Sequence, residues 1–301
     1  MPLVPMTALL RCAVEGCYGI GYFEAWDLRS LEAVLDAAEA ERAPVVLGFG
    51  AMMVDGAWLE RRGIAMLGAA GRTLAERARS PVSLIFNEAE TVDQAFAALD
   101  AGFNAVLLRT DNLEPRAALK ATRRLVERAH AAGASVEAEV GRLPDDARPA
   151  HASETTDPDA ARAFVEETGI DCLAVSIGNV HLKTDGWASI DAALLEAIHR
   201  AVPLPLAVHG GSSFPPDAVP HAVRHGVAKF NVGTVLKAAF RDALLREASA
   251  MPPDADVHVT IGSHTAGDLL APASDALRER VRALIRLYGS SGRALHGEPD
   301  R

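Results

Sequence analysis

The chain has 301 residues, of which 49% are hydrophobic and 23% charged, which suits one large α/β domain or two small ones. A net charge of −10 at pH 7 argues against nucleic acid and anionic membranes as partners. No apolar stretch is long enough to span a bilayer, and three cysteines (Cys12, Cys17 and Cys172) are too few for a disulfide framework. We therefore expect a cytoplasmic protein with reduced cysteines.

Short apolar runs alternate with helical patterns along the chain. The apolar runs predict eight strands, at residues 18–24, 44–50, 81–87, 105–110, 135–140, 172–178, 204–209 and 228–232. Amphipathic spacing predicts helices between them, at residues 27–42, 59–78, 91–101, 114–132 and 157–168. Asp27 and Thr91 occupy N-cap positions, whereas Gly102 and Gly133 follow helix ends.

Eight strand–helix units predict a (β/α)8 TIM barrel, a single domain over residues 1–289. A doubly wound sheet is the alternative, but no G-x-G-x-x-G follows the first strand. The polar, aperiodic residues 141–156 predict a mobile loop over the site. Beyond a second irregular stretch at 251–267, residues 268–288 favour a last helix that caps the barrel or contacts another subunit. Residues 290–301 read as a frayed tail.

Polar side chains lie at the predicted strand ends, which converge on the active site in this fold. His181 and His209 follow the sixth and seventh apolar runs, and two imidazoles at successive strand ends suggest a metal site. Two separately hydrogen-bonded loop histidines are the alternative. The other polar residues at strand ends are Glu24, Asn87, Glu88, Arg109, Asn231 and Thr234.

The fifth predicted strand carries two acids, Glu137 and Glu139. Because they are two residues apart, both point to the same face of the strand. Charges inside such an apolar run are costly without a partner. We expect an ion pair between one of them and Arg109 on the adjacent strand.

Two glycine-rich runs indicate an anion site. Gly210, Gly211 and Ser212 follow the seventh strand, and Gly233 with Thr234 leads from the eighth strand into a helical pattern over 234–245. Bare backbone N–H groups at such turns and at a helix N-terminus suit a phosphate. Ordinary turn chemistry is the alternative.

Several of these segments together resemble a known family. They are the stretches at residues 209–212 (HGGS), 226–234 (GVAKFNVGT), 177–181 (IGNVH), 136–141 (VEAEVG) and the opening at 18–28 with 31–39. Over residues 3–245 the chain resembles the class II fructose-bisphosphate and tagatose-bisphosphate aldolases. The resemblance implies a TIM barrel and a divalent metal, usually zinc. It also implies reversible cleavage of a ketose phosphate to dihydroxyacetone phosphate and an aldehyde, in which the metal polarises the carbonyl and stabilises the enediolate.

The chain departs from that family at the end of the third strand. The family has an Asp that handles a proton and a His that binds metal, whereas this chain has Asn87 and Glu88. Asn87 cannot exchange a proton, but Glu88 can bind a metal. The resemblance thus implies one divalent ion on Glu88, His181 and His209. We expect Zn²⁺, with Mn²⁺, Co²⁺ or Fe²⁺ as alternatives because a carboxylate lowers the charge of the site.

Further departures lie at the other strand ends. Glu24 replaces the family's Asn, and Arg109 replaces an Asp linked to a second metal, which weighs against that second ion. Leu182 replaces a Gly after the first metal His, and Ser213 replaces another Gly. The loop at 183–186 also differs from the family's pattern, so we expect altered phosphate binding on that side.

We interpret the chain as a metal-dependent aldolase, a C–C lyase with altered acid and base residues. The expected catalytic residues are Glu24, Asn87, Glu88, Glu137 and Glu139, with Glu24 exchanging the proton. The expected substrate and phosphate contacts are Gly178, Gly210, Gly211, Ser212, Asn231, Gly233, Thr234 and Arg109. The partners are a sugar phosphate or related ketose and, in a homodimer or homotetramer, further copies of the chain. A sugar-phosphate isomerase or epimerase and a non-catalytic sugar-phosphate-binding barrel are the alternatives.

Overall fold

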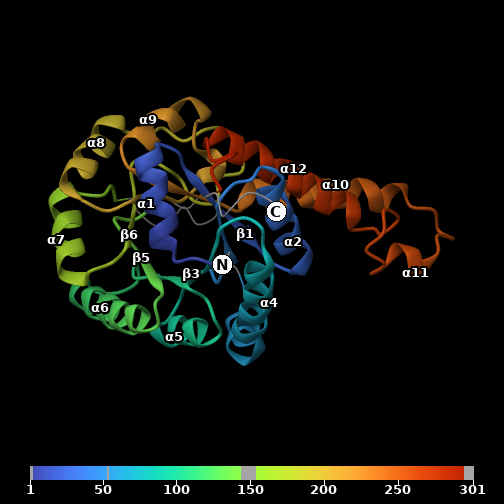
Figure 1. Cartoon of the computed structure of the whole chain (residues 1–301), viewed down its shortest axis with the longest axis horizontal. Coiled ribbons are helices and arrows are strands. Elements are labelled where there is room, and N and C mark those ends of the chain that lie inside the picture. Colours follow the sequence, from blue (N-terminus) through green and yellow to red (C-terminus); the bar gives the residue numbers. More distant parts are fainter. Residues whose placement is uncertain (1–2, 53, 144–153, 295–301) are drawn as a thin grey trace, which may run out of the picture.

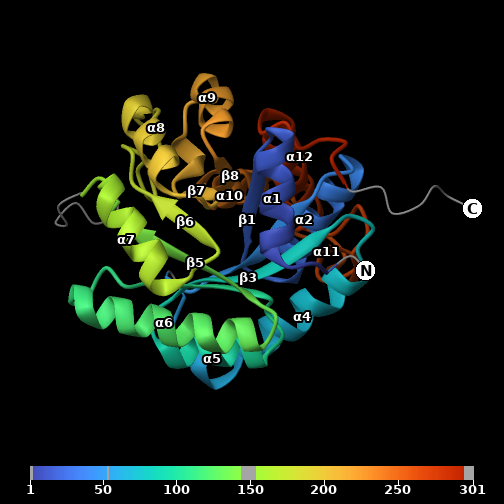
Figure 2. The ribbon, with the colours of Figure 1, turned by 60° about the vertical axis from the view of Figure 1, so that its left-hand side comes forward.

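The computed structural model describes residues 3–52, 54–143 and 154–294. Eight parallel strands in this part of the chain form a closed barrel, in which each strand pairs with the next and β1 pairs with β8 (Figure 2). The predicted (β/α)8 TIM barrel is therefore confirmed, and it is a single domain. The strands are β1 (Ile20–Ala25), β2 (Val45–Gly50), β3 (Val82–Ala89), β4 (Ala105–Leu108), β5 (Ser135–Val140), β6 (Cys172–Val175), β7 (Leu206–Val208) and β8 (Val227–Val232).

Helices surround the barrel and connect its strands (Figure 1). The longer ones are α2 (Leu28–Ala40), α4 (Ile64–Arg77), α5 (Val92–Asp100), α6 (Pro115–Ala131), α7 (Pro158–Thr168), α8 (Ala192–Ala201), α10 (Thr234–Ala250) and α12 (Ala271–Leu287). The short ones are α3 (Gly56–Trp58), η1 (Leu59–Gly63), η2 (Gly211–Ser213), η3 (Pro216–Ala218), α9 (Val219–Arg224) and α11 (Val257–Thr260).

The predicted helix boundaries follow from local chemistry. The side chain of Asp27 accepts a hydrogen bond from the Ser30 backbone, and Thr91 accepts one from Gln94, so both are N-caps as predicted. Gly102 and Gly133 have left-handed backbones, with φ of 97° and 71°, just after α5 and α6.

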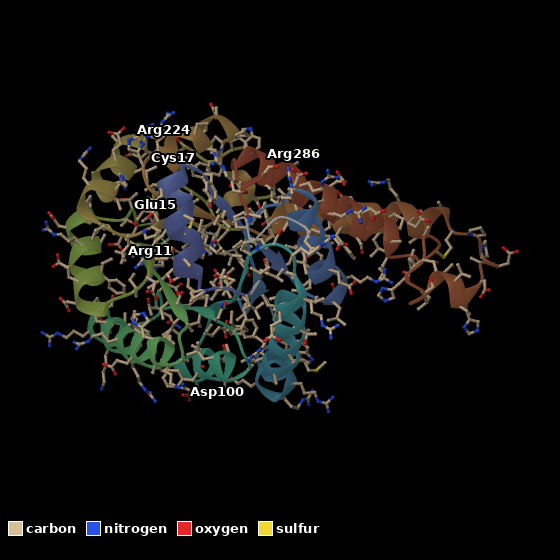
Figure 3. All side chains as sticks on the ribbon, in the orientation of Figure 1. Arg11, Glu15, Cys17, Asp100, Arg224 and Arg286 are labelled. Carbon is tan, nitrogen blue, oxygen red and sulfur yellow. The ribbon has the colours of Figure 1, made fainter. Side chains whose placement is uncertain are left out.

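An N-terminal helix, α1 (Met6–Gly16), was not predicted from the sequence. It contacts β1, β3 and β8 and lies in front of the barrel in Figure 1. Two of its residues, Arg11 and Glu15, are labelled in Figure 3. Met6, Leu9 and Leu10 are buried in one cluster with barrel side chains such as Ile20. Because α1 starts after Pro5 without a side-chain cap, it lacks the cap signal that marked α2 and α5.

Helices α10 and α12 pack on each other and extend beyond the barrel as an arm, with α11 near its end (Figure 1). The arm is anchored where α12 packs on α2, and there Glu41 forms ion pairs with Arg282 and Arg286. The expected fraying after residue 289 is wrong for residues 290–294. The backbone N–H groups of Gly292 and Ala294 donate to the carbonyls of Glu41 and Arg42.

The predicted loop at residues 141–156 lies partly outside the described residues, which omit 144–153. Its two ends are held together, since Arg142 and Glu154 form an antiparallel bridge. No helix in the described ranges is long and apolar enough to cross a membrane. Cys12, Cys17 and Cys172 are free.

Candidate active site

Three strands bring Glu88, His181 and His209 together at one end of the barrel. Glu88 lies near the end of β3, His209 directly follows β7, and His181 lies in the loop after β6. Nε2 of His181 is 3.1 Å from Nδ1 of His209, and each of these atoms is 3.8 Å from Oε1 of Glu88. These three residues, the predicted metal ligands, form a group that could hold a metal ion.

Tight backbone turns fix the three side chains. Glu88 itself has a left-handed backbone with φ of 60°, and Leu182, next to His181, has φ of 52°. Gly210, next to His209, has φ of 67°, and a Cβ there would lie 2.1 Å from the carbonyl oxygen of Val180. Non-glycine residues in this region carry strain, which is typical of positions that functional geometry determines.

The donor set fits a divalent cation. Zn–N and Zn–O bonds of about 2.0–2.2 Å in a tetrahedral site imply about 3.3–3.6 Å between ligand atoms, close to the three distances here. His209 binds through Nδ1 only if its proton is on Nε2, and Nε2 lies 3.1 Å from Oε1 of Glu137, a ready acceptor. The Asn231 amide nitrogen, 2.7 Å from the same Nε2, then has to turn, because two N–H donors cannot share a contact.

Glu137 is part of a buried charge network beneath the histidines. Its Oε2 is 2.8 Å from Nζ of Lys229, and both side chains are fully buried. Lys229 also donates to the amide oxygen of Asn231, and its Nζ lies 4.9 Å from the centre of the Tyr22 ring. Burial raises the pKa of Glu137, but Lys229 and His209 outweigh it and lower the pKa.

The expected ion pair of Arg109 with Glu137 or Glu139 is wrong. Arg109 pairs with Asp111 instead, at 2.9 Å, because both follow the same strand end, whereas Glu137 points toward β8. Glu139 lines a separate cavity together with Asp111 and Arg142. Burial raises the pKa of Glu139 to about 7, opposed by His209 and aided by Glu88.

The electrostatics of the three-residue group favour added positive charge. Burial raises the pKa of Glu88, but His209 and His181 outweigh it and lower the pKa to about 2. Burial lowers the pKa of His209, yet Glu137 and Glu88 raise it to about 9. Carboxylates that favour a proton on His209 also favour a metal cation in its place.

A cavity of about 610 Å³ opens above this group. Of the predicted site residues, it is lined by Glu24, Asn87, Glu88, His181, His209, Gly210, Ser212, Asn231, Gly233 and Thr234. Gly178, Gly211, Glu137, Glu139 and Arg109 are not among its lining residues.

Glu24 forms an ion pair inside the cavity. Its Oε1 is 2.6 Å from Nζ of Lys237, one helical turn beyond Gly233. A Cβ on Gly233 would lie only 2.2 Å from Oε2 of Glu24, so this glycine provides the space for the carboxylate. Burial raises the pKa of Glu24, although Lys237 opposes it.

Asn87 orients the metal-ligand candidate beside it. The Asn87 amide nitrogen donates to Oε2 of Glu88 at 3.0 Å, which leaves Oε1 facing the two histidines. The Asn87 amide oxygen is buried and has no hydrogen-bond partner among the described residues. This oxygen can therefore accept a hydrogen bond from a ligand in the cavity.

Comparison with known proteins identifies the family. The family model described as "Fructose-bisphosphate aldolase class-II" matches residues 4–293. The chain belongs to this family. It is 34% identical to a fructose-bisphosphate aldolase of Thermus caldophilus, across 97% of this chain and 100% of that protein. It is 32% identical to a probable fructose-bisphosphate aldolase of Bacillus subtilis, across 98% and 100%.

Solved structures agree with this assignment. The crystal structure of the YdjI aldolase from Escherichia coli K12 aligns with a TM-score of 0.80 and 27% identity, over 97% of this chain and 100% of that one. A putative fructose-1,6-bisphosphate aldolase from Coccidioides immitis shares the fold, with a TM-score of 0.81 and 23% identity. The protein is thus a metal-dependent aldolase, an aldehyde-lyase. Its family implies a divalent metal, and the Glu88, His181 and His209 group is a candidate site for it.

Two lysines in the aldolase site were missed by sequence reasoning. Lys229 interrupts an apolar strand, and it is two residues before Asn231, so the alternation that marked Glu137 also marks Lys229 as inward-facing. Lys237 is four residues after Gly233, which places it on the same helix face above the turn. The sequence therefore indicated where both lysines point. That Lys229 pairs with Glu137 and Lys237 with Glu24 could not be known without the register of the barrel strands.

Proposed function

We propose that this aldolase cleaves and forms a ketose phosphate or a related sugar-derived substrate, with one divalent ion on Glu88, His181 and His209. The observation that carries this proposal is the set of 3.1–3.8 Å distances among three ligand atoms whose residues line one cavity. Zn²⁺ is the first candidate, because two imidazoles and one carboxylate with an open position suit it. Mn²⁺, Co²⁺ and Fe²⁺ are the alternatives.

The side chains around the cavity have separable roles. When bound, the divalent ion supplies a Lewis acid for the substrate carbonyl oxygen. Breaking the bond between the α and β carbons requires removal of the β-hydroxyl proton and return of a proton to the α carbon. Glu24 lines the cavity and removes the hydroxyl proton, while Asn87 orients Glu88 and the substrate. Glu137 and Lys229 hold His209 in its metal-binding tautomer.

The phosphate of the substrate binds where α10 begins. Gly210, Ser212, Gly233 and Thr234 line this side of the cavity, and the backbone N–H of Val235 donates to the Ser212 hydroxyl at 3.3 Å. Helix N-termini attract anions. Lys237 and Arg241 line the same cavity and add positive charge.

The test is a product assay with fructose 1,6-bisphosphate and tagatose 1,6-bisphosphate, since the Thermus caldophilus relative is a fructose-bisphosphate aldolase. Triose phosphate should be released, the activity should vanish after chelation, and Zn²⁺ should restore it. His209→Ala should bind less metal and lose activity. The surface variant His130→Ala, which breaks only a pair with Asp171, should keep both. A His209→Ala protein that retains stoichiometric metal contradicts the proposed site, and isomerised sugar without triose phosphate contradicts the proposed reaction.

The arm supports assembly into a homodimer or homotetramer. Leu245, Val257, Val259 and Ile261 near its end are between 43% and 65% exposed, more apolar surface than an isolated arm should present to water. We place the enzyme in the cytoplasm, where its three free cysteines would remain reduced.

A further inference from the structure

A second group of metal-ligating side chains lies on the outside of the barrel, between α8 and α9. These helices are side by side in both views (Figures 1 and 2). Glu196 projects from α8, His221 from α9, and His225 follows Arg224, which is labelled in Figure 3. One ligand atom from each residue lies within 4.8 Å of the other two. None of the three lines the aldolase cavity.

The distances suit a small divalent cation. Oε1 of Glu196 is 3.5 Å from Nε2 of His221 and 3.9 Å from Nε2 of His225. Ligand atoms around tetrahedral zinc are separated by about 3.3–3.6 Å, so small side-chain movements complete the geometry. His221 and His225 are four residues apart at a helix end, which puts both rings on one face.

Hydrogen bonding fixes one histidine in a metal-binding tautomer. Nδ1 of His225 lies 2.9 Å from the carbonyl oxygen of His221, which can only accept, so Nδ1 carries the proton. The lone pair of His225 Nε2 therefore remains available toward Glu196. Metal-binding histidines commonly donate their second ring N–H to a backbone carbonyl in this way.

The second histidine has a buried nitrogen that calls for a partner. Nε2 of His221 is inaccessible to water and makes no hydrogen bond within the described part of the chain, although Glu196 is 3.5 Å away. The rings of His221 and His225 are 4.2 Å apart between centroids. Two imidazolium ions that close would repel each other, whereas one divalent cation satisfies both nitrogens.

The carboxylate is also oriented for this role. Arg200 lies 3.8 Å from Oε2 of Glu196, so the other oxygen, Oε1, faces the histidines. His199 is near, with its ring centroid 6.1 Å from that of His225, but it is not part of the group within ligand distance. Water can complete the coordination, as in other zinc sites with three protein ligands.

We propose that Glu196, His221 and His225 form a second divalent transition-metal site, for Zn²⁺ or a similar borderline cation. It has no part in the aldol reaction. It clamps α9 to α8, and α9 follows the loop after β7 that carries His209, so metal there stabilises this side of the barrel.

The test is Zn²⁺ stoichiometry on chelator-treated protein, by equilibrium dialysis with elemental analysis. Wild type should retain one more equivalent of Zn²⁺ than His221→Ala, and Glu196→Gln, which preserves size and helix, should weaken that equivalent at least tenfold. Both variants should keep wild-type aldolase activity. His130→Ala is the matched control, because it removes a surface histidine paired with a single carboxylate, and should bind as wild type does.

Equal Zn²⁺ binding by wild type, His221→Ala and Glu196→Gln would overturn the proposal. The comparison does not depend on the aldolase site, since that site is the same in all three proteins. A thermal-shift experiment gives a second readout. Ni²⁺ should raise the Tm of the His209→Ala protein but not that of a protein carrying both His209→Ala and His221→Ala, and an equal rise in both also contradicts the site.

Discussion

The two groups of two histidines and one glutamate use the same ligand types at similar distances, but their surroundings differ. In the group at the barrel mouth, the His209 side chain is 2% exposed and rests on the buried Glu137–Lys229 pair. In the outer group, the side chains of Glu196, His221 and His225 are 28–38% exposed, and the supporting hydrogen bond is local to α9. We therefore propose cation binding for both groups, but the aldol reaction only for the one whose ligands are rigidly supported beside a cavity.

The largest expected effect is a loss of kcat without a loss of metal from the group at the barrel mouth. Glu24→Gln should lower kcat by about 10²–10⁴, because the amide cannot take the hydroxyl proton. Metal content, measured on the same preparation, should not change at either group. Asn87→Asp should instead weaken metal binding, since it replaces the amide that donates to Oε2 of Glu88 with a second carboxylate. Normal turnover by Glu24→Gln would assign the proton transfer to another group, with Glu88 the first to examine.

The second prediction removes the buried Glu137–Lys229 ion pair, which supports the group at the barrel mouth but not the outer group. Lys229→Met should lower the free energy of unfolding by about 3–5 kcal/mol, because Glu137 is then a buried charge without its cation. Lys237→Met is the matched control, since Lys237 is 42% exposed and its pair with Glu24 should contribute at most about 1 kcal/mol. Urea denaturation measures both, and similar losses in the two variants would contradict the distinction.

The third prediction uses pH. The pKa of Glu139, about 7, lies above its ordinary 4.5, so the folded state binds more protons and stability falls as pH rises from about 4.5 through 7. Glu139→Gln should remove this fall, which amounts to about 3 kcal/mol. Unfolding of chelator-treated wild type and variant at pH 4.5 and pH 8 measures the difference. An unchanged pH profile would show that Glu139 is solvated.

Glu41→Gln provides a control of opposite sign. Hydrogen bonds from Arg286, Ser291 and Arg282 lower the pKa of Glu41 to about 2, against a smaller effect of burial. Its contribution to stability is therefore present above about pH 4.5 and is lost as pH falls toward 2. The Glu41→Gln variant should be less stable than wild type at neutral pH and approach wild type in acid.

The smallest predicted effect on metal binding concerns the carboxylate behind His209. Glu137→Gln should weaken metal binding at the barrel mouth by about 10–100-fold, because the amide is a poorer acceptor for the Nε2 proton. It should also lower the free energy of unfolding, because Lys229 is then a buried charge without its anion. The outer group is the internal control, and its Zn²⁺ affinity should stay constant. Equal weakening at both groups would indicate a general loss of folding rather than a local one.

Sequence reasoning predicted the barrel and its strand ends because periodicity and caps are local signals. Asp27, Thr91, Gly102 and Gly133 acted as predicted. The ion-pair partners of the buried side chains could not be predicted, because they depend on how strands far apart in the sequence meet in the barrel. Glu137 on β5 faces Lys229 on β8, three strands later in the chain, and not the nearer Arg109.

The candidate metal groups differ in how far the sequence predicted them. Glu88, His181 and His209 were predicted together as metal ligands, and their atoms come within ligand distance of one another. The outer group was missed although His221 and His225 have helical spacing, because nothing in the sequence indicates that α8 delivers Glu196 beside them.

The space at Gly233 constrains how this enzyme can diverge. A side chain there would force the Glu24 carboxylate to shift away from its present place beside Lys237. Residues 24 and 233 lie on the first strand and after the last strand of the barrel, yet the side chain at 233 sets how the side chain at 24 can lie. Among descendants of this sequence, a larger residue at 233 should therefore be accompanied by a moved or replaced Glu24.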